Sequence, residues 1–283
     1  MNLAAVYLAS PRDWGWLKWS RLDCLEASLK LLRLNAPSVQ VLIFHEDYTD
    51  ADKERLWRVY PRIKFEPVDF STHKDRYKPG YRSERVGSYG YGMMCRFFCG
   101  VVQSHPLLQG FSHYMRLDDD SYLLSPLTAD VLRRIEASDY TYRCSFGDEH
   151  RALWAFALDF MRRHQIPIPD GLDYSESVPY TNYHTASLKL WRHPVVQQFM
   201  ADIEAADGCI TKGWDDAVVQ GVMVRLMFPA MGMKAHREQG FCYRHNQHCS
   251  HRPGTSHGAL CKDGNDAHHH GDINQQWGPP ANL

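Results

Sequence analysis

The chain has 283 residues, of which 44% are apolar and 23% are charged, and its formal net charge is −1. Length and composition indicate a globular protein with one large domain or two small ones. The balanced charge argues against nucleic acid or an anionic membrane as partner, and no apolar run is long enough to predict a transmembrane helix. Any phosphate-bearing ligand must therefore be held by local groups or by a metal.

The first 70 residues alternate between strand-like and helix-like patterns. Strands are predicted over residues 4–9, 39–45 and 63–68, and helices over residues 22–32 and 51–60. The run VQVLIFH at residues 39–45 is continuously apolar, which is typical of a buried parallel strand. The order βαβαβ predicts an α/β fold with a mostly parallel sheet covered by helices.

Residues 71–87 interrupt this alternation with a polar segment that carries five Lys and Arg side chains. We expect a loop here. Its charge has two interpretations, a solvated surface or a lid over a diphosphate, and the sequence leaves both open.

The rest of the chain alternates the two patterns less regularly. A helix is predicted over residues 91–103 and a strand over 112–117, and Ser125 and Pro126 are expected to begin the next helix as N-cap and first-turn proline. Three further helices are predicted, over residues 153–160, 196–203 and 214–227. Beyond residue 253 the chain is rich in Gly, His and Asn. We therefore expect one domain at residues 1–253 and a loosely ordered tail at 254–283.

The N-terminal residues lack the basic start and the long apolar segment of a signal peptide. No Asn-X-Ser/Thr glycosylation acceptor is present. We expect a cytoplasmic protein, and a trimmed Golgi anchor is the alternative.

Eight cysteines are spread along the chain. Cys24, Cys95 and Cys99 lie in helix-like segments and are expected to be buried free thiols. Cys242, Cys249 and Cys261 lie among histidines near the C-terminus. A zinc site, ordinary thiols and one disulfide all stay open there, although no close Cys-x-x-Cys pair supports zinc.

Asp118, Asp119 and Asp120 directly follow the strand predicted over residues 112–117. Adjacent carboxylates repel one another unless a cation or solvent relieves them. The alternation of a strand places Asp118 and Asp120 on one face and Asp119 on the other. Two carboxylates beside open positions suit Mg²⁺ or Mn²⁺ bridging a diphosphate, and ligands of open α/β sheets gather at the carboxyl ends of strands. The triplet therefore predicts a divalent-metal site for a phosphate-linked ligand.

Several segments carry a resemblance to a known family. Residues 91–100 (YGMMCRFFCG) resemble a Tyr-x-x-Met-Cys-Arg-Phe-x-Ser-Gly helix, and residues 114–120 (YMRLDDD) resemble a Tyr-x-Arg-Val-Glu-Pro-Asp metal motif. Residues 213–217 (GWDDA) resemble an Arg-Trp-Gly-Asp-Ala segment. Together with shorter matches at residues 105–107, 181–183 and 188–192, they resemble the fungal α-1,2-mannosyltransferases of glycosyltransferase family 15. Order and spacing agree over more than half of the chain.

The resemblance implies a GT-A-type fold, a divalent metal, and transfer of mannose from GDP-mannose, with retention, to a hydroxyl of a glycan acceptor. It places the metal on Asp118 and Asp120. His245 joins them if a two-residue insertion is allowed, whereas an ungapped alignment puts Tyr243 there; imidazole is the better ligand for Mn²⁺. A surface histidine is the plain alternative for His245.

The remaining site residues also follow from the resemblance. Asp216 falls near the acceptor, although it and Asp215 could simply begin a helix. The donor side comprises Tyr91, Arg96, Arg116 and Asp119. A phosphate contact and a pairing with an internal carboxylate are both open for Arg96.

His184 is the main departure from the family pattern, because it stands where the family has a Glu that is often proposed as nucleophile. We place His184 at the catalytic centre, but imidazole is a poor glycosyl nucleophile. Retention by front-face attack is one route, and inversion with Asp215 or Asp216 as general base is another. A non-catalytic nucleotide-sugar or glycan-binding relative is the rival class. A metal-dependent phosphoesterase is weaker, because a second cluster of His and Asp is lacking.

Overall fold

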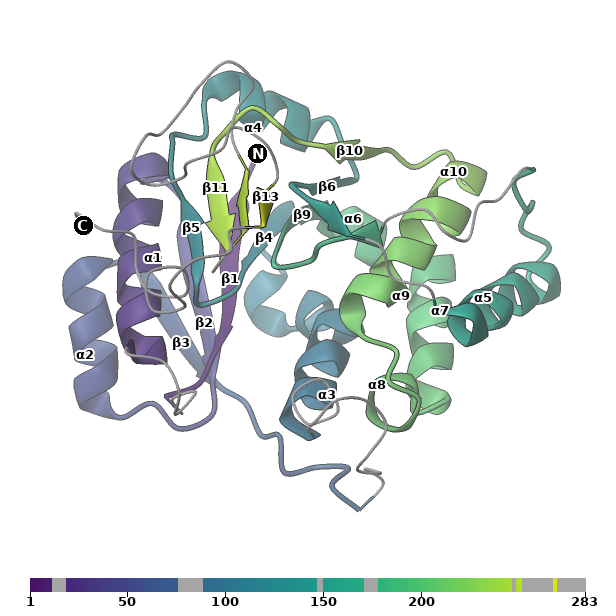
Figure 1. Cartoon of the computed structure of the whole chain (residues 1–283), viewed down its shortest axis with the longest axis horizontal. Helices are drawn as coiled ribbons and strands as arrows, with labels where there is room; N and C mark the ends of the chain where they lie inside the picture. The colour runs from purple at the N-terminus through teal and green to yellow at the C-terminus, as the bar shows by residue number, and fades with distance from the viewer. Residues whose placement is uncertain are drawn as a thin grey trace.

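The computed structural model describes residues 1–11, 19–75, 89–146, 150–170, 178–245, 248–250 and 267–268, the last two ranges by their backbone alone. Its central strands are β1 Leu3–Ala9, β2 Gln40–His45, β3 Ile63–Pro67, β4 His113–Leu117, β6 Tyr140–Tyr142, β9 Tyr183–Ser187 and β10 Ala235–Arg237. They form a seven-stranded sheet in the order β10-β6-β9-β4-β1-β2-β3. All neighbours are parallel except β9, which is antiparallel to β4 and β6. The predicted mostly parallel α/β sheet is confirmed (Figure 1).

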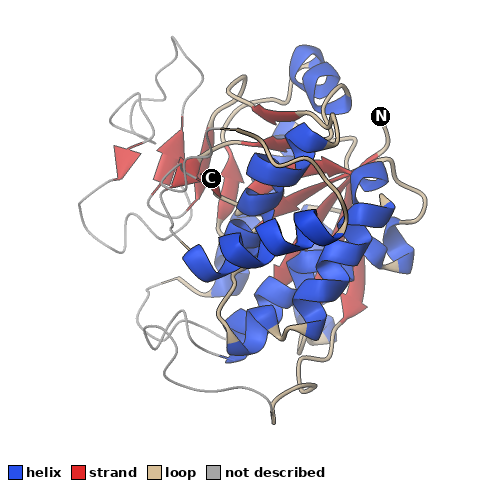
Figure 2. Ribbon diagram, turned by 90° about the vertical axis from the view of Figure 1, so that its right-hand side faces the viewer, coloured by secondary structure: helices blue, strands red, loops and turns tan. Residues whose placement is uncertain are grey.

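Helices cover both faces of this sheet. They are α1 Arg21–Asn35, α2 Asp50–Val59, α3 Tyr89–Arg96, α4 Ala129–Glu136, α5 Arg151–Arg163, α6 Leu188–Trp191, α7 Pro194–Ala205, α8 Gly208–Thr211, α9 Asp216–Val222 and α10 Phe228–Ala230. Shorter helical segments are η1 Phe97–Val101, η2 Val102–Ser104, η3 Pro106–Leu108 and η4 Met223–Met227. Figure 2 shows the helices of the second half of the chain gathered in front of the strands.

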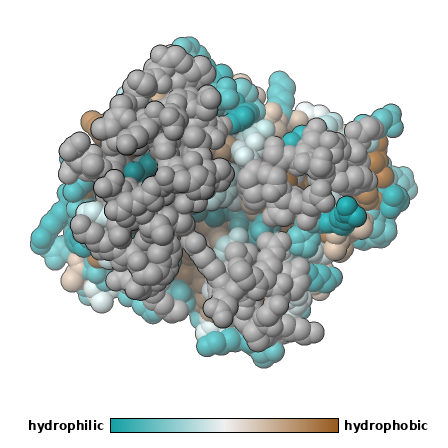
Figure 3. All heavy atoms as spheres, in the orientation of Figure 1, coloured by the Kyte–Doolittle hydropathy of each residue, from teal (hydrophilic) through white to brown (hydrophobic). Residues whose placement is uncertain are grey.

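Strand alternation divides the core in two. Ala4 and Val6 of β1 pack into the cluster that includes α5, α7 and α9, whereas Ala5 and Tyr7 pack into the cluster with α1 and α2. Side chains on both faces of β1 are therefore buried, which explains why apolar residues follow one another along this strand. Only Leu56 of α2 is buried, and the exposed side of this helix is mostly charged apart from Trp57. Figure 3 shows hydrophilic side chains along this rim of the molecule.

The helices of the first half begin where their capping residues predict. Ser20 caps α1 in a reciprocal capping box with Asp23, and Thr49 caps α2 in the same way with Asp52. Each box satisfies backbone N–H groups that have no partner within the helix. These local signals fix the starting points of both helices.

A second sheet extends from the end of β4. It contains β5 Ser121–Leu123, β11 Tyr243–His245, β12 His248–Ser250 and β13 Ala267–His268 in the order β13-β12-β11-β5. β11 is antiparallel to β5 and pairs His245 with Ser121. A separate two-stranded ladder joins β7 Ser145–Phe146 to β8 Val178–Pro179. The β5–β11 pairing brings the end of the domain beside the acidic triplet.

Three predicted helices differ in their bounds. Ser125 and Pro126 do not begin a helix: α4 starts after Thr128, and the Ser125 hydroxyl instead accepts the Cys242 N–H at 2.8 Å. The helix predicted over residues 91–103 is broken at Gly100, whose φ is +118°. The helix predicted over residues 214–227 begins only at Asp216, because Asp215 is its N-cap. Side-chain competition for backbone donors and one left-handed residue explain these differences.

Within the described ranges, no helix has the length and apolarity that crossing a bilayer requires. Of the predicted tail at residues 254–283, the structure describes Ala267–His268. Residues 76–87 of the predicted loop, and Cys261 of the possible zinc cluster, lie outside the described residues. Cys24, Cys95 and Cys99 are buried, and none of them is in a disulfide.

Candidate active site

The acidic triplet leaves the carboxyl end of β4 and divides between two partners. His245 Nε2 lies 3.0 Å from Asp120 Oδ1 and 3.5 Å from Asp118 Oδ2. Asp119 turns the other way, and its Oδ2 accepts the Arg21 Nε–H at 2.6 Å. The alternation of strand side chains accounts for this division. The β5–β11 ladder thus joins an imidazole to the two carboxylates that the sequence places on one face.

The side chains of Asp118, Asp120 and His245 are suitable ligand types for a divalent cation, but they are not spaced around a metal position. Two carboxylates and an imidazole are ligand types that Mn²⁺ accepts, and His245 Nδ1 is buried without a hydrogen-bond partner. In the described part of the chain, no group of three or more His, Cys, Asp or Glu side chains is arranged around a metal position. His245 pairs directly with both carboxylates, so a cation would have to displace its imidazole from these ion pairs.

Charge is concentrated strongly in this group. Burial raises the pKa of Asp118, but the Arg116 charge and His245 outweigh it, so that pKa is lowered well below its usual range. Burial lowers the pKa of His245, but the Asp120 charge dominates and raises it well above its ordinary value. Burial raises the pKa of Asp119 to about 6 despite Arg21. Asp118 and His245 therefore carry opposite charges at neutral pH.

Arg116 connects the triplet to Asp216. Its Nε–H donates to Asp118 Oδ1 at 3.0 Å, and its Nη1–H donates to Asp216 Oδ2. The same Asp216 oxygen accepts the Thr181 hydroxyl at 2.7 Å. The guanidinium lies 3.7 Å from the centre of the Phe98 ring, and the Arg116 side chain is only 3% exposed. Arg116 therefore holds two carboxylates rather than an open phosphate position.

Asp215 and Asp216 have different roles in the same helix start. Asp215 Oδ1 accepts the Val218 N–H at 3.0 Å, so it is the N-cap of α9. Asp216 is buried in the first turn and points back to Arg116. A helix N-terminus favours a carboxylate in this position.

His184 lies within the core. Its side chain is fully buried, its Nε2 is 2.8 Å from the Tyr114 hydroxyl, and its ring stacks on Tyr140 at 5.2 Å. Nδ1 lies 3.2 Å from the Thr181 carbonyl oxygen. Burial, reinforced by the Arg116 charge, lowers the pKa of His184 to about 3. A neutral ring with both nitrogens engaged presents no nucleophile to a substrate in this conformation.

The two other predicted donor-side residues lie on α3. The Arg96 Nε–H donates to both carboxylate oxygens of Glu204, at 2.9 and 2.8 Å. The internal-carboxylate alternative therefore describes Arg96 in this conformation. Tyr91 is half-buried, and burial raises its pKa, with Cys95 and Asp215 nearby.

Sequence reasoning did not single out Arg21, Thr181 or Phe98 for the site. Arg21 is 98 residues from Asp119, so no local pattern links them. Phe98 and Thr181 lie inside segments that match the family, but neither side chain is of a type that by itself suggests catalysis or metal binding. Their contacts become visible only in three dimensions.

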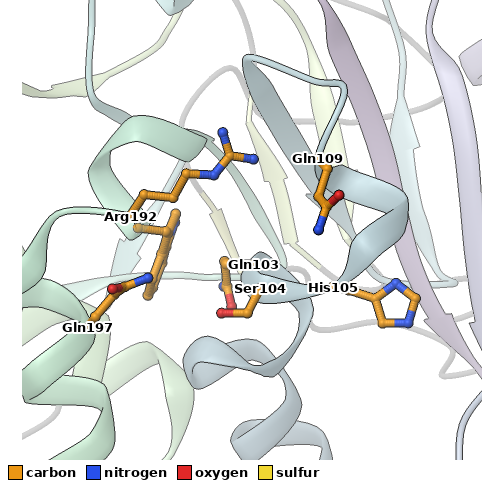
Figure 4. A pocket seen from close by; sticks show the side chains of 7 residues that line it. Gln103, Ser104, His105, Gln109, Arg192 and Gln197 are labelled. Atoms are coloured by element: carbon orange, nitrogen blue, oxygen red, sulfur yellow. The ribbon is translucent and has the colours of Figure 1, made fainter.

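A separate cavity of about 180 Å³ lies at the other end of β4. Figure 4 shows Gln103, Ser104, His105 and Gln109 on one side of it and Arg192 and Gln197 on the other. None of the predicted site residues lines this cavity.

A family model described as glycolipid 2-alpha-mannosyltransferase matches residues 71–275. The chain belongs to this family. The glycolipid 2-alpha-mannosyltransferase match includes the triplet, Asp216 and His245, while β1, β2 and β3 precede it. The resemblance inferred from the motifs is confirmed.

Relatives and solved structures agree with this family assignment. A glycolipid 2-alpha-mannosyltransferase of Saccharomyces cerevisiae is 23% identical over an alignment of 198 residues that covers 64% of this chain and 45% of the relative. The chain thus spans about half the length of the curated relatives it matches. The Mn/GDP form of core-mannan synthase A from Aspergillus fumigatus aligns with a TM-score of 0.70 and 18% identity, over 88% of this chain and 76% of that one.

Two further structures define the fold. The mannosyltransferase Ktr4p from S. cerevisiae in complex with GDP has a TM-score of 0.69 and 17% identity, over 88% of this chain and 72% of that one. The galactosyltransferase LgtC, crystallised with donor and acceptor sugar analogues, has a TM-score of 0.51 and 10% identity, over 84% and 73%. The GT-A fold predicted for this member of the glycolipid 2-alpha-mannosyltransferase family is confirmed.

Proposed function

We propose that this chain is a metal-dependent glycosyltransferase that moves mannose from GDP-mannose to a hydroxyl of a glycan acceptor. The convergence of Asp118, Asp120 and His245 at the carboxyl end of β4 carries this proposal. Family membership and the GDP and Mn/GDP states of similar structures support it.

Asp118, Asp120 and His245 would hold Mn²⁺ or Mg²⁺. The bound cation would neutralise charge on the diphosphate leaving group. Arg116 keeps Asp118 ionised and in place, and it restrains Asp216 through the same guanidinium. Asp119 and Arg21 anchor the back of the turn.

Asp216 is our candidate for orienting or deprotonating the acceptor. Both of its side-chain bonds, from Arg116 and Thr181, reach Oδ2. We assign His184 a positioning role, in which its two ring nitrogens contact the Tyr114 hydroxyl and the main-chain oxygen of Thr181. Without a nucleophile at residue 184, retention would proceed by front-face attack, and inversion with Asp216 as base is the alternative.

The test replaces one carboxylate and removes the metal. Asp120→Asn should abolish transfer from GDP-mannose while the melting temperature falls little, and EDTA should abolish transfer by the parent protein. Asp159→Asn is the matched control and should keep full activity, because Asp159 is 63% exposed on α5 and pairs with Arg163. Full activity of Asp120→Asn in metal-free buffer would exclude the proposal.

The second candidate function is binding of a nucleotide-sugar without turnover. The enclosed position of His184 favours it, because the family's proposed nucleophile position holds a buried neutral ring. GDP-mannose hydrolysis with Mn²⁺ separates the two candidates. Tight donor binding with neither hydrolysis nor transfer would establish the binding function.

A further inference from the structure

The turn that precedes β9 passes through the candidate site, and each of its residues contacts a different part of it. The Tyr180 ring lies edge-on to His245 at 5.5 Å. Thr181 donates its hydroxyl to Asp216. The main-chain oxygen of Asn182 accepts the Asp118 N–H at 3.3 Å and the Ser121 hydroxyl at 3.2 Å. The main chain of this turn thus fixes the start of the acidic triplet.

The side chain of Asn182 has no such contacts. The residue is 2% exposed, and neither its Nδ2 nor its Oδ1 has a hydrogen-bond partner. Among the residues that the structure describes, Asn182 is the only one with two buried, unpartnered side-chain polar atoms. A buried amide without partners destabilises the folded state, so its presence beside Asp118 requires an explanation.

The two unpartnered atoms specify the chemistry of a ligand. Nδ2 needs an acceptor, and Oδ1 needs a donor or a cation. A phosphate oxygen only accepts and a metal ion only binds Oδ1, so either would satisfy one atom and leave the other unpaired. A hydroxyl both donates and accepts, and neighbouring hydroxyls on a sugar ring can satisfy both atoms together.

We propose that the Asn182 carboxamide binds hydroxyl groups of the hexose carried by the nucleotide-sugar donor. This inference rests on the proposed function and names a donor-binding residue for it. The donor is favoured over the acceptor because the main chain of Asn182 holds Asp118, while its neighbour Thr181 holds Asp216. Because Asn182 is 2% exposed, sugar binding must include a local movement that opens the amide to the ligand.

The first experiment measures the melting temperature without ligand. Asn182→Leu removes both polar atoms at nearly constant shape, so it should leave the melting temperature unchanged or raise it by about 2–4 °C. Asn35→Leu is the matched control: Asn35 is also buried, but its Nδ2 donates to the Leu123 carbonyl at 2.7 Å. It should lower the melting temperature. If Asn182→Leu lowers it as much as Asn35→Leu does, the amide is structural and the inference is wrong.

The second experiment compares the dissociation constants of GDP and GDP-mannose in the presence of Mn²⁺. Asn182→Leu, and Asn182→Ala in case Leu does not fit, should bind GDP as the parent does. Both should bind GDP-mannose about tenfold more weakly, equivalent to about 1.4 kcal/mol. Equal weakening for both ligands would place the amide on the nucleotide. A change confined to the acceptor KM would place it on the acceptor, and no change would exclude any sugar contact; each result overturns the inference.

The parent protein separates failure of the inference from failure of the proposed function. If the parent binds neither GDP nor GDP-mannose, the proposed GDP-mannose activity fails and the inference falls with it. If the parent binds both and the Asn182 variants bind GDP-mannose normally, only the inference fails.

Discussion

Replacing His184 by glutamine tests whether this residue is a neutral part of the core. Burial lowers the pKa of His184 to about 3, whereas the unfolded chain has its ordinary pKa of about 6.5. Between these values the unfolded state binds a proton that the folded state does not. Stability is therefore fully present above pH 6.5 and is lost as pH falls toward 3. Glutamine keeps one donor and one acceptor for Tyr114 and Thr181 but does not titrate.

The expected magnitude follows from the same two pKa values. Each unit of pKa is worth about 1.4 kcal/mol. Lowering the pH from 7.0 to 4.5 should therefore reduce the free energy of unfolding of the parent by about 2.5 kcal/mol through His184 alone. His184→Gln should lack this contribution. The variant should be less stable at pH 7.0, by about 1–3 kcal/mol for lost packing, and this deficit should shrink or reverse at pH 4.5.

Urea denaturation at the two pH values measures this difference directly. A stability deficit of His184→Gln that is identical at pH 7.0 and 4.5 would refute the reasoning, because the folded state would then bind the proton at the ordinary pH.

Three further substitutions separate catalysis from stability. Asp216→Asn should lower kcat/KM by about 10²–10⁴-fold, the range of general acid–base groups, and steady-state kinetics that show nearly normal turnover would remove Asp216 from the reaction. Arg116→Gln should cost about 3–5 kcal/mol in urea denaturation, because Asp216 would stay buried without its countercharge; a loss below 1 kcal/mol would mean that the pair is solvated. Gly100→Ala should cost about 1–3 kcal/mol, because φ is +118° and a Cβ would lie 3.3 Å from Met200 Cβ, and an unchanged melting temperature would contradict this backbone geometry.

The sequence by itself determined the first half of the fold. β1 and β2 are recognisable because both of their faces are buried, so apolar residues follow one another without a break. β3 is the edge strand, and only Ile63 of it is buried. The helices between them carry their start signals locally, in Ser20 and Thr49. The triplet was recognisable for a similar reason, since three adjacent carboxylates after a strand are a local pattern.

Tertiary structure decided the rest of the site. His245 contacts Asp118 and Asp120 only because β11 pairs with β5. The sequence alignment favours His245 only if a two-residue insertion is allowed, and it places Tyr243 there otherwise. Tyr243 instead lies 2.7 Å from the Ser121 hydroxyl. Strand pairing over such sequence separations depends on the packing of the whole sheet, which local patterns do not contain.

The same reason explains the roles of the buried polar residues. Nothing in the local sequence distinguishes Arg116, which pairs with Asp118 and Asp216, from Arg96, which pairs with Glu204. Nor does the sequence show that His184 is enclosed or that the amide of Asn182 lacks partners. Whether a buried polar group is paired depends on atoms that the fold brings from distant segments, so only the tertiary structure determines it.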